Sequence, residues 1–309
     1  MKKILEKAEF NLLILVGDIF QIESIVFGNW FEAIRSFVSE KSVTELKNPY
    51  RTEDEGLLNV WDRVRRLDHA ILEPLVKNNY SARLEESIFD RYERDQIILC
   101  LNYDGLYGIN NINKFLQANN PEFPIQWGIN TYKIGDPILF NESSSSRFSP
   151  VIYNNLKGSI LDIEVFEKNI QFVVEIDKMI DGSDAWGQNS KLVQTSNENM
   201  NSVIRFSVDK YKSTDEDDDL SSNTIVPFQV AYAVSIHKAQ GLEYNSVKII
   251  ITDEVGELIT HNVFYTAITR AKEKLKIYWT PETENKILNN FKLKNNNKNV
   301  HLLKAKYNL

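Results

Sequence analysis

Apolar residues along the chain fall into short runs that alternate with segments of helical spacing. Residues 11–16 and 96–101 are continuous apolar runs, which are typical of strands buried on both faces of a parallel sheet. Residues 29–38, 57–64 and 110–118 predict helices, and in 57–64 the apolar side chains share one face. Alternating strands and helices predict an α/β fold around a parallel sheet.

The spacing changes between residues 131 and 174, where short β-rich pieces are separated by serine, asparagine and glycine. Such closely spaced short strands predict a small β-barrel inserted into the α/β fold. After Pro227 the α/β alternation returns. The expected strands there are residues 230–236, 247–251 and 275–279, and a helix is expected over residues 264–272.

The composition limits the classes of protein that the chain can be. A net charge of -7 argues against a surface that binds nucleic acid all over, although a local basic groove is compatible with it. The single cysteine, Cys100, lies in an apolar run and is expected to be a buried structural thiol. The first residues lack the apolar core of a signal peptide, and no apolar stretch approaches about 20 residues. We therefore expect a cytoplasmic protein with no membrane partner.

The most specific chemical signal is a pair of segments, residues 233–244 and 264–272, with an expected strand between them. They read Ala-Val-Ser-Ile-His-Lys-Ala-Gln-Gly-Leu-Glu-Tyr and Phe-Tyr-Thr-Ala-Ile-Thr-Arg-Ala-Lys. Both resemble the fifth and sixth helicase motifs of superfamily 1, in the branch of RecD-like and UvrD-like enzymes. Residues 17–21, Gly-Asp-Ile-Phe-Gln, resemble the third motif, and residues 48–51, Asn-Pro-Tyr-Arg, resemble the fourth. Four motifs in the right order argue against a chance match.

The resemblance implies a RecA-like parallel-sheet lobe of the P-loop NTPase type, with an inserted small SH3-like β-barrel. Its organisation along the chain is expected to follow five segments. They are a remnant of the first RecA-like lobe (1–45), the first part of the second lobe (46–141), the inserted β-barrel (142–227), the second part of the second lobe (228–285) and a C-terminal tail (286–309).

The resemblance also assigns residues to a nucleotide site. Arg270 and Arg51 match the two arginines that reach the γ-phosphate in the family, where a planar guanidinium stabilises the charge that develops on phosphate oxygens. If residues 264–272 are helical, Arg270 points away from the buried stripe of that helix. Gln21 would sense the γ-phosphate or the attacking water. Three further residues are placed near the nucleotide: Asp18, Gly241 and Glu243.

The same resemblance implies a path for single-stranded DNA. Ser235 can cap a short helix that runs through Gln240, while Gly241 can supply the positive φ that ends it. Contacts from such a turn to the nucleic-acid backbone carry little base information, so binding is expected to be largely independent of sequence. An aromatic side chain at the end of a strand could stack on a base, with packing in the core as the alternative for Tyr103. The residues expected to meet DNA are Ser235, His237, Lys238, Thr266, Asn102 and Tyr103.

One part of an ATPase is not found in the sequence. A phosphate-binding loop needs glycine-rich backbone, a lysine and a serine or threonine, and the chain has no Gly-Lys-Ser or Gly-Lys-Thr. Residues 249–254 resemble a strand followed by the Asp-Glu that positions Mg²⁺, but they follow the fifth motif, so we expect no metal role for them. We expect the chain to be truncated. ATP and Mg²⁺ are then cofactors of the intact parent, with none bound here, and the first RecA-like lobe is a partner.

Three functions remain to be distinguished. The first is the C-terminal motor fragment of an ATP-dependent superfamily 1 DNA helicase, inactive as an ATPase alone. The second is a non-catalytic DNA-binding or scaffold module derived from a helicase. The third is a nuclease, for which the only clustered acids are residues 215–219. The short insertion between Asn141 and Pro227 favours the RecD-like branch by analogy, with movement from 5′ to 3′.

Overall fold

The computed structural model describes residues 7, 9, 11–23, 30–68, 70–141, 152–180, 190–196, 200–210, 224–292 and 297–307. Its helices are α2 (Trp30–Arg35), α3 (Glu55–Arg66), α4 (Leu72–Lys77), α5 (Ile109–Asn119), α6 (His261–Ile268), α7 (Pro281–Asn290) and α8 (Asn297–Tyr307), with short 3-10 turns η1 (Glu40–Ser42), η2 (Glu86–Phe89) and η4 (Asp253–Leu258). Its strands form two larger sheets and one hairpin of β3 (Ile125–Trp127) with β4 (Asn130–Tyr132).

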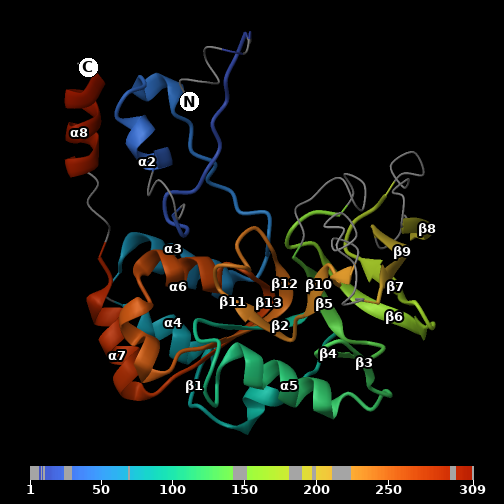
Figure 1. Ribbon diagram of the computed structural model, residues 1–309. Coiled ribbons are helices and arrows are strands. Elements are labelled where there is room, and N and C mark those ends of the chain that lie inside the picture. The colour runs from blue at the N-terminus through green and yellow to red at the C-terminus, as the bar shows by residue number, and fades with distance from the viewer. Residues whose placement is uncertain are drawn as a thin grey trace.

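The first sheet is five-stranded and parallel throughout, in the order β1-β13-β12-β2-β11. Its strands are β1 (Ser81–Ala82), β2 (Gln96–Cys100), β11 (Ala233–Ser235), β12 (Tyr244–Ile250) and β13 (Ala271–Tyr278). Helices α3, α4, α6 and α7 lie over one face of this sheet and α5 over the other (Figure 1). The predicted α/β fold with a parallel sheet is therefore confirmed.

Helix α3 shows how the sequence builds this layer. Asp54 caps its N-terminus by accepting from the backbone N–H of Leu57 at 2.8 Å, and Leu67 ends the helix in the left-handed conformation. Trp61 lies on the buried stripe and donates its indole N–H to the carbonyl of Ile268, at the end of α6. The bond sets α3 against the end of the helix that precedes Arg270.

The second sheet is six-stranded, antiparallel and in the order β10-β5-β6-β7-β9-β8. Its strands are β5 (Pro137–Phe140), β6 (Lys157–Val165), β7 (Asn169–Ile176), β8 (Ser190–Ser196), β9 (Asn201–Asp209) and β10 (Phe228–Val230). Strands β7 and β9 alternate buried and less buried residues, as expected of a sheet with one face in a core. The β-rich insertion is present, but closure into an SH3-like barrel stays a prediction.

The predicted limits of the insertion, 142–227, leave out its first and last strands. Strands β5 and β10 pair with each other, Phe140 opposite Phe228, and both belong to the antiparallel sheet. The two sheets also share a buried junction at Asp136, whose carboxylate accepts from Gln117, from Asn120 and from the Tyr232 hydroxyl. This fully buried acceptor ties α5 and the start of β11 to the start of β5.

Several expected elements differ in the structure. Residues 11–16 are an exposed extended segment, and within the described ranges no strand pairs with them, so the predicted buried strand is wrong. The helix expected over 29–38 is the shorter α2. The helix expected over 264–272 ends at Ile268, with Thr269 as its C-cap, and β13 starts at Ala271.

The remaining sequence predictions concern the tail, the acidic run and the cysteine. Helix α7 crosses the expected boundary at residue 286, since Thr280 caps it and Pro281 begins it. The acidic run 215–219 lies outside the described residues. Cys100 is buried as predicted, and burial raises the pKa of its thiol to about 12. Among the helices that the structure describes, none is long and apolar enough to span a bilayer.

Candidate nucleotide and nucleic-acid site

Two arginines that are far apart in the sequence meet beside the loop before β12. Arg51 donates from Nε to the carboxylate of Glu243 at 3.1 Å and from Nη1 to the carbonyl of Thr269 at 2.6 Å. Arg270 follows Thr269 directly and donates from Nη1 to the carbonyl of Leu242 at 2.9 Å. Arg51 and Arg270 therefore bind adjacent residues, Glu243 and Leu242, in the loop before β12.

The Arg270 side chain is buried, with 0% of the residue exposed, which corrects the expectation that it points away from the core. The shorter α6 explains the difference, because Arg270 lies after the helix and not on its outer face. It also donates to the carbonyl of Thr266 at 2.9 Å and to the Thr269 hydroxyl at 3.2 Å. Burial, and then the nearby charge of Arg51, lower the pKa of Arg270 to about 10.

The segment from Asp18 to Ile22 lies beside the elements that carry this pair. Gln21 donates its side-chain amide to the Asp18 carboxylate at 3.2 Å, so two predicted site residues contact each other. The backbone N–H of Ile22 donates to the Thr266 hydroxyl at 2.9 Å, and the Gln240 amide donates to the carbonyl of Ile22 at 3.0 Å. The segment is thus bound both to α6 and to the turn after β11.

The turn after β11 carries the residues expected to meet DNA. Ser235 is buried and its hydroxyl accepts from the backbone N–H of Lys238 at 3.2 Å, as the capping prediction requires. Gly241 has the predicted positive φ of 86°. Between them residues 236–240 form hydrogen-bonded turns and not the expected helix. His237 is exposed on this turn.

Lys238 leans toward the antiparallel sheet. Its ammonium donates to the side chain of Gln229 at 2.7 Å and to that of Asn141 at 3.3 Å. Burial lowers the pKa of Lys238. The lysine is therefore held by uncharged oxygens, at the place where the parallel sheet passes into the antiparallel one.

Comparison with known proteins shows similarity to helicases. Residues 230–278 match the UvrD-like helicase C-terminal domain. The RecBCD enzyme subunit RecD of Buchnera aphidicola subsp. Schizaphis graminum is 24% identical over 285 residues, which cover 80% of this chain and 40% of that protein. RecD of Haemophilus influenzae is 23% identical over 305 residues, which cover 86% of this chain and 46% of that protein. The chain contains a superfamily 1 helicase C-terminal region.

The chain spans less than half the length of these two curated relatives. Among solved structures, Pif1 helicase from Bacteroides in complex with ADP-AlF3 and ssDNA has a TM-score of 0.49 and 15% sequence identity, covering 94% of this chain and 66% of that chain. The helicase region matched by the family, 230–278, holds the turn after β11, Glu243 and Arg270.

The other residues predicted for the helicase site differ in how far they are buried. Asn102 and Tyr103 follow β2, where the Asn102 amide donates to the Glu254 carboxylate at 3.4 Å and the Tyr103 ring is about half exposed. Tyr103 is therefore not a core residue. Thr266 is fully buried inside α6, and the structure does not place it where it could contact DNA.

The helicase region also depends on residues that the sequence did not predict. Lys157, at the start of β6, donates to the carbonyl of Glu243 at 2.8 Å, and Asp95, just before β2, accepts from the backbone N–H of Asn245 at 3.0 Å. Neither residue lies in a motif, and only the spatial pairing of distant elements brings them to this loop.

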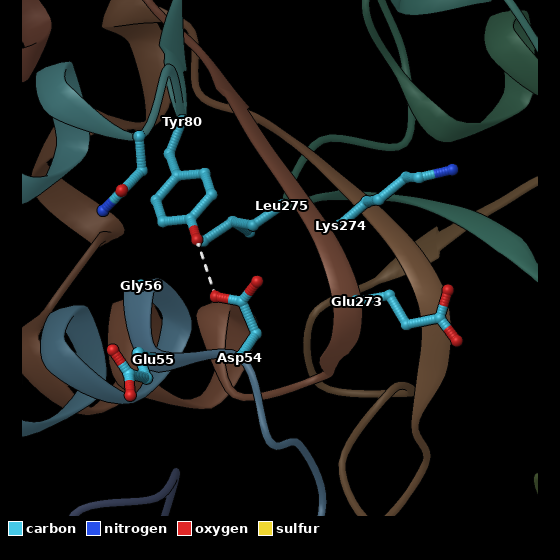
Figure 2. A pocket seen from close by; sticks show the side chains of 8 residues that line it. Asp54, Glu55, Gly56, Tyr80, Glu273, Lys274 and Leu275 are labelled. Carbon is cyan, nitrogen blue, oxygen red and sulfur yellow. Dashed lines mark hydrogen bonds between the residues drawn. The ribbon is translucent and has the colours of Figure 1, made fainter.

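A pocket of about 510 Å³ lies apart from these residues, at the N-terminus of α3 beside β13 (Figure 2). In it the Tyr80 hydroxyl donates to the Asp54 carboxylate at 3.2 Å. Burial, with the Asp54 charge, raises the pKa of Tyr80 to about 12. None of the predicted helicase residues lines this pocket, which is formed by Asp54, Glu55, Gly56, Asn78, Tyr80, Glu273, Lys274 and Leu275.

Proposed function

We propose that this chain is the second motor lobe of an ATP-dependent superfamily 1 DNA helicase. The observation that carries the proposal is the meeting of Arg51 and Arg270 at one loop, within reach of the Asp18 charge. Two guanidinium groups so close to each other repel, and an anion between them would offset that repulsion. A γ-phosphate presented by a first lobe is such an anion.

The two arginines have different roles in this proposal. The Arg51 side chain is 27% exposed and its partner Glu243 is 48% exposed, so this side of the cluster is open to solvent. A γ-phosphate would replace the Glu243 carboxylate as the partner of Arg51. Arg270 then acts from beside it, after giving up one of its bonds to Leu242 or Thr269. Gln21 orients the attacking water.

ATP and Mg²⁺ enter the proposal through the other lobe. Among the residues that the structure describes, no three His, Cys, Asp or Glu side chains are grouped as a bound metal would require. We propose that the first lobe supplies the Mg²⁺ ligands, and no step is assigned to the metal here. We define the two-lobe motor as this chain together with a first RecA-like lobe that carries a phosphate-binding loop. The chain alone is proposed to be inactive as an ATPase.

Single-stranded DNA is proposed to cross the ends of β2 and β11, which are neighbours in the parallel sheet. His237 is exposed on the turn that follows β11, and Tyr103 is exposed after β2. Lys238 supplies positive charge on the side of the turn that faces the antiparallel sheet. Tyr103 offers a ring on which a base can stack. The buried Ser235 hydroxyl stabilises this turn by accepting from the backbone N–H of Lys238.

Replacing Lys238 with alanine tests the DNA-binding half of the proposal on this chain itself. Binding of labelled single strands of several sequences is expected to weaken by a similar factor for each, because a phosphate contact carries no base information. The slope of log affinity against log salt is expected to fall by about 0.7. Fluorescence anisotropy at several salt concentrations measures both quantities.

The control for Lys238→Ala is Lys286→Ala, which removes a lysine of α7 that pairs with Glu257 of η4. This variant should keep the affinity and the salt slope of the starting protein. If Lys238→Ala leaves the slope unchanged, the assignment of DNA to this turn is wrong.

A second function, a DNA-binding scaffold without motor activity, is favoured by one observation. Arg270 is fully buried and its guanidinium donates to three oxygens of neighbouring residues, as in a structural residue. The two functions differ in one measurement, since a scaffold never supports ATP hydrolysis, even when a first lobe is present.

A further inference from the structure

Lys157 lies where the antiparallel sheet meets the nucleotide side of the parallel sheet. It begins β6, and its side chain is only 16% exposed. Its ammonium lies 3.0 Å from Asp95, 3.0 Å from Asp177 and 2.8 Å from the carbonyl of Glu243. Two hydrogen bonds, to Asp95 and to the Glu243 carbonyl, and an ion pair with Asp177 hold the ammonium in one place.

These contacts join three elements that are distant in the sequence. Asp177 follows β7 in the antiparallel sheet, and its own backbone N–H donates to the carbonyl of Lys157 at 3.0 Å. Asp95 precedes β2 in the parallel sheet. Besides Lys157, it binds the backbone N–H of Asn245 with its carboxylate and that of Ser246 with its carbonyl. Lys157 and Asp95 thus hold one side of the segment from 243 to 246.

Arg270 holds the other side of the same segment. It donates to the carbonyl of Leu242 at 2.9 Å, and its own carbonyl accepts from the backbone N–H of Tyr244 at 2.9 Å. The Lys157 ammonium also lies 4.5 Å from the centre of the Tyr244 ring. The peptide between Glu243 and Tyr244 is therefore fixed between Lys157 and Arg270.

The orientation of the Glu243 carboxylate depends on that peptide. Glu243 is 48% exposed, and its carboxylate contacts Arg51 at 3.1 Å and Lys272 at 3.8 Å. An exposed side chain keeps one direction only while its backbone is held, because side-chain ion pairs at a surface contribute little by themselves. Whatever fixes the Glu243 backbone also fixes the partner of Arg51.

We propose that Lys157 is a positioning residue for the arginine pair, holding the Glu243 backbone so that Arg51 and Arg270 keep the spacing that a γ-phosphate requires. The antiparallel sheet is in this way connected to ATP hydrolysis, because a shift of β6 moves the loop that lies between the two arginines. The inference rests on the proposed function for its catalytic part. Its structural part concerns this chain alone.

The structural part is tested with Lys157→Met, which keeps the length of the side chain and removes its charge. The matched control is Lys178→Met, because Lys178 is also a partly buried lysine of the antiparallel region and lies over the Tyr153 ring. Hydrogen exchange of the amides of residues 244–246 is expected to rise about tenfold or more in Lys157→Met, since a bond to a charged group is lost. It should be unchanged in the control.

The catalytic part is tested in the two-lobe motor. Because a small misplacement of a catalytic group can cost about 100-fold in rate, Lys157→Met is expected to lower kcat by about 10- to 100-fold while KM for ATP stays within a few-fold. Lys157→Arg, which keeps the charge, should recover part of the loss. Thermal unfolding of each variant identifies a protein that fails to fold. If Lys157→Met fails to fold, the kcat of Lys157→Arg alone tests the positioning role.

The outcomes separate this inference from the proposed function. If Arg270→Ala lowers kcat but Lys157→Met leaves kcat or the exchange of residues 244–246 unchanged, the positioning role is wrong and the proposed function stands. If Arg270→Ala leaves kcat unchanged, both are wrong. Faster exchange together with a lower kcat and a constant KM supports the positioning role.

Discussion

Replacing Arg270 with alanine is expected to lower the ATPase rate of the two-lobe motor by about 10³-fold or more, as for other arginines that act on a transferred phosphoryl group. The affinity for single-stranded DNA should stay within a few-fold. The reason is that Arg270 lies with Arg51 at the loop between Gln240 and β12, while the DNA contacts are assigned to the turn after β11 and to the end of β2. Steady-state hydrolysis and anisotropy measure the two quantities.

Arg270 is buried and bonded, so the loss of its side chain could also disturb the fold. Arg270→Lys separates the two effects, because it keeps the charge but loses the planar donors that a phosphate can use in pairs. Its rate should remain far below that of the starting protein. The control is Arg63→Ala, an arginine on the outer side of α3 that pairs with Glu73. An Arg270→Ala variant that folds and hydrolyses ATP normally contradicts the proposed role.

Replacing Phe172 with alanine is expected to lower the free energy of unfolding by about 3–5 kcal/mol. Phe172 is fully buried in β7, and its ring centre lies 5.2 Å from that of Tyr132, 5.8 Å from that of Phe206 and 5.1 Å from that of Phe228. The loss combines removed apolar area with a cavity between three rings, which come from β4, β9 and β10. Denaturant titration followed by circular dichroism measures the change.

The matched control for Phe172→Ala is Phe166→Ala, since Phe166 lies just after β6 and is 50% exposed. Its removal should change the free energy of unfolding far less. Equal losses at the two positions would show that the antiparallel sheet has no well-packed core at Phe172.

Much of the fold follows from periodicity. Residues 57–64 and 96–101 were placed correctly, because a helical stripe and a short apolar run each match one kind of buried element. Residues 11–16 have the same kind of run as β2 but lie exposed, since composition cannot show whether a neighbouring strand pairs with them. The predicted end of α6 is wrong because the helix stops before Thr269 and Arg270, and neither position is a glycine or a proline that would mark a helix end in the sequence.

The motifs single out the candidate site residues but do not give the contacts between them. The order of the motifs brings Arg51, Gln21, Glu243 and Arg270 into consideration together, and in the structure Arg51, Glu243 and Arg270 lie at one loop while Gln21 contacts Asp18. The order of motifs does not show how deeply a side chain is buried. For this reason the sequence predicts an exposed Arg270, whereas the structure buries it. Lys157 was not predicted, because its partners Asp95 and Glu243 are 62 and 86 residues away and belong to other elements.

ATP hydrolysis measured with this chain alone, and again after addition of a first RecA-like lobe, tests the central claim most directly. The chain alone is expected to show no DNA-stimulated hydrolysis above background, because its sequence has no Gly-Lys-Ser or Gly-Lys-Thr to bind the phosphates. Addition of the lobe is expected to produce hydrolysis that depends on DNA and on Arg270. Hydrolysis by the pure chain would contradict the claim and would direct attention to Asp253 and Glu254, whereas no hydrolysis with the lobe present would leave the scaffold function.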